Sequence, residues 1–144
     1  MKLNNRYYAL LCGLTFVSLS CAQQTLEVLE PWVRIPPPGM NMLAGYGEFT
    51  NSSNSTIELV SAQSENFKSI SFHISEIVDG ISKMTKLESV LLRPGETARF
   101  EPGGKHLMIS TPQYDERPEQ VQIEFLSVSG KRYQVNFVFL NSEP

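Results

Sequence analysis

The chain has 144 residues, of which 41% are hydrophobic and 19% charged, and its formal net charge at pH 7 is −3. This length and apolar content fit one globular domain with a core, which excludes a largely disordered chain. The mild acidity argues against nucleic acid or an anionic membrane surface as a partner, whereas a cation is compatible with it.

The first 22 residues have the pattern of a secretory signal peptide. Lys2 and Arg6 precede an apolar run over residues 9–19, and small residues follow that run. The run is too short to span a bilayer comfortably, and no later apolar run approaches that length. We therefore predict that the chain is exported, and we expect it in the periplasm.

Small residues at the end of the leader predict cleavage after Ala22, leaving residues 23–144 as the exported domain. In the alternative, Cys21 carries a lipid, although Ser18 stands where lipoprotein signals usually have leucine. Cys12 and Cys21 are the two cysteines of the sequence, so the exported domain has no disulfide to stabilise it. Losing the two basic leader residues changes the formal charge from −3 to −5.

Beyond the leader, short alternating segments between turn residues predict an all-β domain. Nine strands are expected, at about residues 26–33, 43–50, 56–63, 70–78, 81–90, 97–101, 105–110, 121–125 and 133–139. Strands of this length and spacing are typical of an antiparallel Greek-key β-sandwich.

Asp79 and Gly80 form a hairpin signal of the kind whose two central residues have positive φ. Counting outward from a two-residue turn places Val78 opposite Ile81, Ser75 opposite Met84, and His73 opposite Lys86. His73 and Met84 are then diagonal neighbours on one face, at roughly 7 Å between Cβ atoms. A three-residue turn would instead move Met84 to the other face.

His106 and Met108 are two residues apart on one predicted strand, so both point to the same face. Leu107 and Ile109 point the opposite way and are expected in the core, as are Phe72 and Ile74 on either side of His73. We therefore predict that both histidines, with Met84 and Met108, lie on outward faces or at a rim.

Two imidazoles and two thioethers make a soft, electrically neutral set of metal ligands. Thioether sulfur favours Cu(I) over Zn²⁺ or Mg²⁺, and imidazole also accepts Cu(II). Without a cysteine thiolate, the set does not make a blue-copper electron-transfer centre. A single surface histidine is seldom a ligand, and a single methionine usually fills a core, so the prediction rests on the combined arrangement. Met40 and Met42 could either form a further thioether pair or cover the end of the sandwich.

The four residues have a defined spacing: ten residues separate His73 from Met84, twenty-one separate Met84 from His106, and one separates His106 from Met108. This pattern resembles the copper-binding signature of the periplasmic copper chaperones called PCuAC. Further matches to that family are Trp32 and Arg34 before a Pro-Gly stretch, Gly45-Tyr46, Asp79-Gly80, Pro94-Gly95 and Pro102-Gly103-Gly104.

The resemblance implies a cupredoxin-like β-sandwich that binds Cu(I) through His73, Met84, His106 and Met108. It also implies delivery of copper to the CuA or CuB centres of haem–copper oxidases, often alongside Sco-type proteins. Many members have Glu-Met or a similar pair after the first histidine, whereas Ile74-Ser75 follows here, so one optional methionine ligand is missing.

Two other classes of protein compete with a copper carrier, besides a general role in copper tolerance. An exported module that recognises a protein or glycan surface would have no copper affinity and would show an exposed aromatic or apolar patch, for which Tyr46, Phe67 and Tyr114 are candidates. An enzyme would need an acid–base constellation, and two histidines shared with a metal motif leave little for one. We therefore expect no catalytic activity.

Overall fold

A computed structural model describes residues 26–144 of the chain. The strands are β1 Leu26–Arg34, β2 Met42–Asn51, β3 Ile57–Gln63, β4 Phe67–Val78, β5 Ile81–Leu87, β6 Val90–Leu92, β7 Thr97–Phe100, β8 Lys105–Pro112, β9 Gln120–Ser127 and β10 Arg132–Leu140. No helix occurs in this part of the chain, and so none that could cross a membrane. The predicted all-β class is confirmed.

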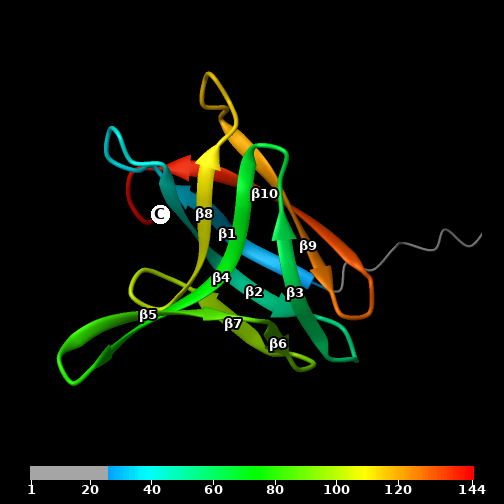
Figure 1. Cartoon of the computed structure of the whole chain (residues 1–144). Helices are drawn as coiled ribbons and strands as arrows, with labels where there is room; N and C mark the ends of the chain where they lie inside the picture. Colours follow the sequence, from blue (N-terminus) through cyan, green and yellow to red (C-terminus); the bar gives the residue numbers. More distant parts are fainter. Residues whose placement is uncertain (1–25) are drawn as a thin grey trace, which may run out of the picture.

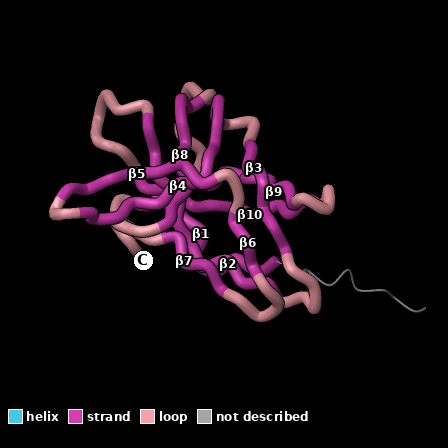
Figure 2. Tube along the Cα trace, turned by 60° about the horizontal axis from the view of Figure 1, so that its bottom comes forward, coloured by secondary structure: helices cyan, strands magenta, loops and turns pink. Residues whose placement is uncertain are grey.

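Seven of the strands pair in a closed ring, in the order β3, β4, β8, β2, β1, β10, β9 and back to β3 (Figure 1). The other three attach to this ring: β5 to β4, β6 to β3, and β7 to β2 and β8. The tip of the β4–β5 hairpin extends away from the ring in both views of the backbone (Figures 1 and 2). The Greek-key connection stays a prediction.

Two details differ from the expected strands. The segment 81–90 is not one strand: β5 ends at Leu87, and Val90–Leu92 forms the separate strand β6, which pairs with β3. The pairing is also not antiparallel throughout, because β1 lies parallel to β10. These two strands come from opposite ends of the domain, so no tight turn constrains their direction.

Large apolar side chains fill the interior of the ring. Phe49 is fully buried, and its ring lies 4.6 Å from that of Phe100 and 5.2 Å from that of Phe125, centroid to centroid. Phe72, Leu107 and Ile109, each predicted to face the core, are 2%, 0% and 0% exposed. This inner face holds β4 and β8 in place, so their outward side chains have fixed positions.

Asn51, at the end of β2, is a fully buried polar residue. Its side-chain nitrogen donates to the carbonyl oxygens of Ser55 (2.8 Å) and Leu92 (2.9 Å). Its side-chain oxygen accepts from the backbone N–H (2.9 Å) and the hydroxyl (2.7 Å) of Ser53. One side chain thus joins β2, the following loop and β6.

We expect Asn51→Ala to lower the free energy of unfolding by about 2–4 kcal/mol, because it leaves buried carbonyl and N–H groups without partners. Chemical denaturation followed by circular dichroism measures this loss. Asn54→Ala, in the exposed part of the same loop, is the matched control and should change stability by less than about 0.5 kcal/mol. Equal effects of the two substitutions would contradict the structural role of Asn51.

Candidate metal centre

The β4–β5 turn has the predicted geometry. Asp79 and Gly80 both have positive φ, of 53° and 77°. The pairs Val78 with Ile81, Ser75 with Met84, and His73 with Lys86 are all present. The predicted register is therefore confirmed, and Met84 lies diagonal to His73 on one face of the hairpin.

The two histidines lie directly opposite one another on neighbouring strands. His73 of β4 pairs with His106 of β8, and their ring centroids are 5.9 Å apart with the rings tilted by 34°. Met108 shares the face of His106, while the side chain of Leu107 between them is fully buried. The sheet thus brings both predicted ligand pairs to one outward face.

A groove of about 410 Å³ opens on this face. Among its lining residues are three of the four predicted ligands, Met84, His106 and Met108. His73 does not line the groove itself and lies beside it through its pairing with His106. The groove is also lined by Arg34, Pro36, Pro37, Met40, Met42, Leu43, Ala44 and Tyr46.

All four side chains lie on the predicted face, but His106 is buried there and is not exposed at the surface. This residue is only 7% exposed, whereas Met84 is 55% exposed and His73 and Met108 are partly buried. The difference arises because the outward face of β8 is covered: β4 and β2 pair on its two sides, and the groove walls rise over it. His106 therefore lies at the floor of the groove, and Met84 on its open side.

Hydrogen bonds define how each imidazole is presented. His106 Nδ1 lies 3.1 Å from the carbonyl oxygen of Gly104, and since a carbonyl only accepts, Nδ1 carries the hydrogen. In the neutral ring this leaves Nε2 with a free lone pair, as in many metal-binding histidines. His73 Nε2 lies 3.1 Å from the Ser71 hydroxyl. Its Nδ1 is the only buried side-chain nitrogen or oxygen of residues 26–144 without a hydrogen-bond partner.

The surroundings of His73 favour its neutral form. Burial lowers its pKa below the usual value of 6.5, and the neighbouring His106 and Lys86 lower it further. Neutral imidazole is the form that binds a metal ion. Within residues 26–144, no three His, Cys, Asp or Glu side chains converge as a metal site. The groove lining combines an imidazole with thioethers, and such a mixed set suits a soft ion such as Cu(I).

Sequence reasoning missed the wall of the groove that β1 and β2 supply. Arg34 places its guanidinium carbon 5.6 Å from the ring centroids of both Trp32 and Tyr46. Arg34 and Tyr46 line the groove, and Ala44 lies opposite Met108 in the sheet. Trp32, Arg34 and Tyr46 were among the matches to the PCuAC family, but the sequence did not place them beside the histidines, because the pairing of β2 with β8 is a long-range contact.

The aromatic patch expected for a surface-recognition module is not formed by its candidates. Tyr46 is 6% exposed and Phe67 is 3% exposed, so both are buried, and Tyr114 is partly buried against Phe67. These residues do not form an exposed patch, because the sequence did not show which neighbouring segments cover each of them. Tyr46, for example, packs on Trp32 with ring centroids 4.7 Å apart.

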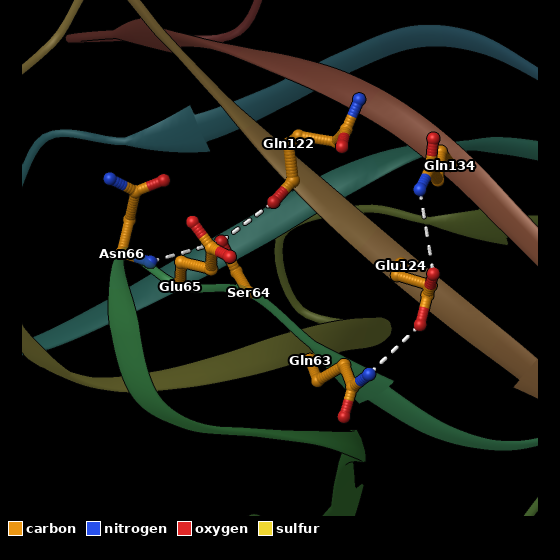
Figure 3. Close-up of a pocket in the computed structure, with 7 residues that line it drawn as sticks. All are labelled: Gln63, Ser64, Glu65, Asn66, Gln122, Glu124 and Gln134. Atoms are coloured by element: carbon orange, nitrogen blue, oxygen red, sulfur yellow. Dashed lines mark hydrogen bonds between the residues drawn. The ribbon is translucent and has the colours of Figure 1, made fainter.

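A second hollow, of about 440 Å³, is polar and has neither histidine nor methionine in its lining (Figure 3). Its lining residues are Gln63, Ser64, Glu65, Asn66, Gln122, Glu124 and Gln134. Several of these groups satisfy one another: Gln63 donates to Glu124 (2.8 Å), and the Ser64 hydroxyl donates to the carbonyl oxygen of Gln122 (2.6 Å). The lining therefore offers hydrogen-bonding surface and no metal ligands of the predicted kind.

The lowered pKa of His73 predicts a pH dependence of stability for the metal-free protein. Between the folded and unfolded pKa values the unfolded chain binds more protons, so stability rises with pH in that range. We expect stability to fall as the pH is lowered from about 7.5 to about 5, starting near the ordinary histidine pKa of about 6.5. Urea denaturation in the presence of a chelator measures this, and His73→Gln should flatten the profile. If the stability of His73→Gln fell just as steeply over this pH range, His73 would not be the source of the pH dependence.

Comparison with known proteins places the chain in a family. A family model described as "Putative lipoprotein LpqE-like" matches residues 26–142. A Rickettsia prowazekii protein without a named function is 27% identical in an alignment of 131 positions, which covers 85% of this chain and 71% of that protein. A Leifsonia xyli subsp. xyli protein named "Putative lipoprotein" is 31% identical over 111 residues, 70% of this chain and 66% of that protein.

Solved structures of PCuAC domains share the fold. A copper-bound PCuAC domain from PmoF2 has a TM-score of 0.66 at 18% identity, covering 82% of this chain and 94% of that domain. The apo form of DR1885 from Deinococcus radiodurans has a TM-score of 0.61 at 19% identity, covering 99% and 97% of the two chains. The fold implied by the resemblance to PCuAC is thereby confirmed. The β fold of this chain is that of PCuAC domains. Because the family model matches most of the chain, the chain belongs to the LpqE-like family.

Proposed function

We propose that this protein is an exported carrier of Cu(I), which it holds through His73, Met84, His106 and Met108. The observation that carries this proposal is the strand register, which sets the two imidazoles opposite one another and brings Met84 of β5 and Met108 of β8 to the same face. The buried, unpartnered Nδ1 of His73 supports it, because a bound ion would give that nitrogen a partner.

The copper content of related structures supports the same conclusion. The PmoF2 domain was solved with copper bound, and DR1885 was also solved in its Cu(I) form, which has a TM-score of 0.57 at 20% identity over 87% of this chain and 86% of that chain. Copper can therefore be accommodated by this fold. The proposal for the present chain rests on its own imidazoles and thioethers.

The proposed mechanism is ligand exchange without redox chemistry. Four neutral donors hold a Cu⁺ ion without cancelling its charge, so a recipient that offers thiolates or a more enclosed site binds it more strongly. Met84 is 55% exposed on the projecting hairpin, whereas His106 is buried at the floor of the groove. Met84 would therefore be the first ligand to yield, and His106 the last. No catalytic step is assigned to this site.

For the recipient we propose a haem–copper oxidase subunit, reached directly or through a Sco-like protein, as the resemblance implies. A general role in periplasmic copper tolerance is the alternative. Deletion of the gene, with growth compared in copper-limited and copper-rich cultures, separates the two. Loss of oxidase activity that added copper restores would favour assembly, and sensitivity confined to excess copper would favour tolerance.

Export fits the leader over residues 1–22, which lies outside the described residues. We propose that the mature protein begins either at Gln23 or at an acylated Cys21. The names of the family and of the Leifsonia relative as lipoproteins support the acylated form. Intact mass of the protein recovered from membranes decides between them, because a lipidated cysteine adds acyl chains that an unmodified Gln23 terminus lacks.

We expect residues 23–144, which contain every described strand, to bind one tight equivalent of Cu(I) in an anaerobic titration against a chromophoric chelator. His106→Ala combined with Met108→Ala should weaken that equivalent by at least about 100-fold, because a buried imidazole and a thioether are both lost.

The control for this titration is Ser110→Ala, which changes the next outward residue of β8 and no predicted ligand. Its affinity should stay within about twofold of the unaltered protein. No competition with the chelator by the unaltered protein would overturn the copper proposal. A module for recognising a protein or glycan surface would then be the better account.

A further inference from the structure

Met40 and Met42 belong to the same groove as the proposed ligands. Together with Met84 and Met108 they make up every methionine of residues 26–144, and all four line this one hollow. Met84 approaches it from the hairpin, whereas Met40 and Met42 come from the opposite wall, formed by the β1–β2 loop and the start of β2. Chance packing gives no reason for four methionines from three separate segments to meet.

The pairing of β2 with β8 sets Met42 close to Met108. Met42 pairs with Ser110, and Ala44 pairs with Met108. Met42 and Met108 are therefore diagonal neighbours on one face, at about 7–8 Å between backbone positions and within reach of long side chains. Ala44, opposite Met108, is too small to separate the two thioethers.

Backbone hydrogen bonds constrain the loop that carries Met40. The backbone N–H of Met40 donates to the carbonyl oxygen of Pro37 at 3.2 Å, closing a turn with Pro38 and Gly39 at its centre. Gly39 has a φ of 85°, as a type II turn requires at that position. The next residue is fixed as well, because the carbonyl oxygen of Asn41 accepts from the backbone of β8 at 2.9 Å. The thioether of Met40 is thus presented by a stiff loop at little entropic cost.

Burial in the core does not explain these methionines. Met40 is 55% exposed and Met42 is 41% exposed. Eleven large apolar side chains of residues 26–144 are exposed, and the three methionines among them, Met40, Met42 and Met84, all line the groove. A methionine that merely filled a gap in the core would be covered.

We propose that Met40 and Met42 form a second position for a soft monovalent ion, Cu(I) or its analogue Ag(I), which can also use the sulfur of Met108. This inference rests on the proposed function. Thioethers alone bind such ions more weakly than a set with two imidazoles, so the second position is a station on the path between solvent and the histidines. Met108 belongs to both positions, and the ion passes between them by exchanging one neutral donor for another.

The experiment is an anaerobic titration of residues 23–144 with ¹³C-labelled methionine methyl groups, in which the methyl signals are followed by NMR. One sample is titrated with Cu(I) and a separate sample with Ag(I). Single Met→Leu variants assign the four methyl signals. We expect the first equivalent to shift the signals of Met84 and Met108, and the second to shift those of Met40 and Met42. Met40→Leu combined with Met42→Leu should abolish the second equivalent and keep the first affinity within about twofold, because the imidazoles remain.

A matched control replaces two exposed apolar residues outside the groove, Ile77→Leu with Ile81→Leu, and should keep both equivalents. Shifts of Met84 and Met108 with no change at Met40 and Met42 would overturn the second position and leave the carrier function intact. No shift of any methyl signal would overturn the carrier function itself. Shifts confined to Met40 and Met42 would support the second position and contradict the His-Met site.

Discussion

Cross-strand register is the constraint on which the candidate site depends. Successive side chains of a strand alternate between the two faces of a sheet, so each pairing fixes which residues can meet. The pairing of His73 with His106 links β4 to β8, and the β4–β5 turn places Met84 on the same outward face. A slip of one residue in either pairing would turn these side chains to the opposite face. The positions of the proposed ligands therefore depend on the registers of the β4–β8 and β4–β5 pairings.

The core beneath the site maintains those registers. Leu107, between His106 and Met108, is fully buried, and Phe72, next to His73, is 2% exposed. A slip would carry these side chains into solvent and the ligands into the apolar interior, with a loss of about 1.5–3 kcal/mol for each large side chain. The same alternation that builds the core thus holds the ligands outward, and no disulfide is needed for it.

The groove has a firm side and an open side, which suits an ion that must be both held and released. His106 is buried and bonded to the Gly104 carbonyl, so its ring has little freedom. Met84 is exposed on an arm that pairs with the rest of the sheet along β4 alone. An incoming ligand from another protein can displace Met84 without disturbing the core. Opposite this arm, the Pro37–Met40 turn forms a stiff wall of the same groove.

The sequence by itself determined what depends on local chemistry: the strands apart from the division of 81–90, the positive-φ turn at Asp79 and Gly80, and the face shared by His106 and Met108. These follow from alternation and turn geometry over a few residues. Only the tertiary structure decided the parallel pairing of β1 with β10, the burial of His106, and the arrival of Met40 and Met42 at the groove. The physical reason is that such contacts join strands far apart in the chain, and alternation shows which residues share a face but not which strand covers that face.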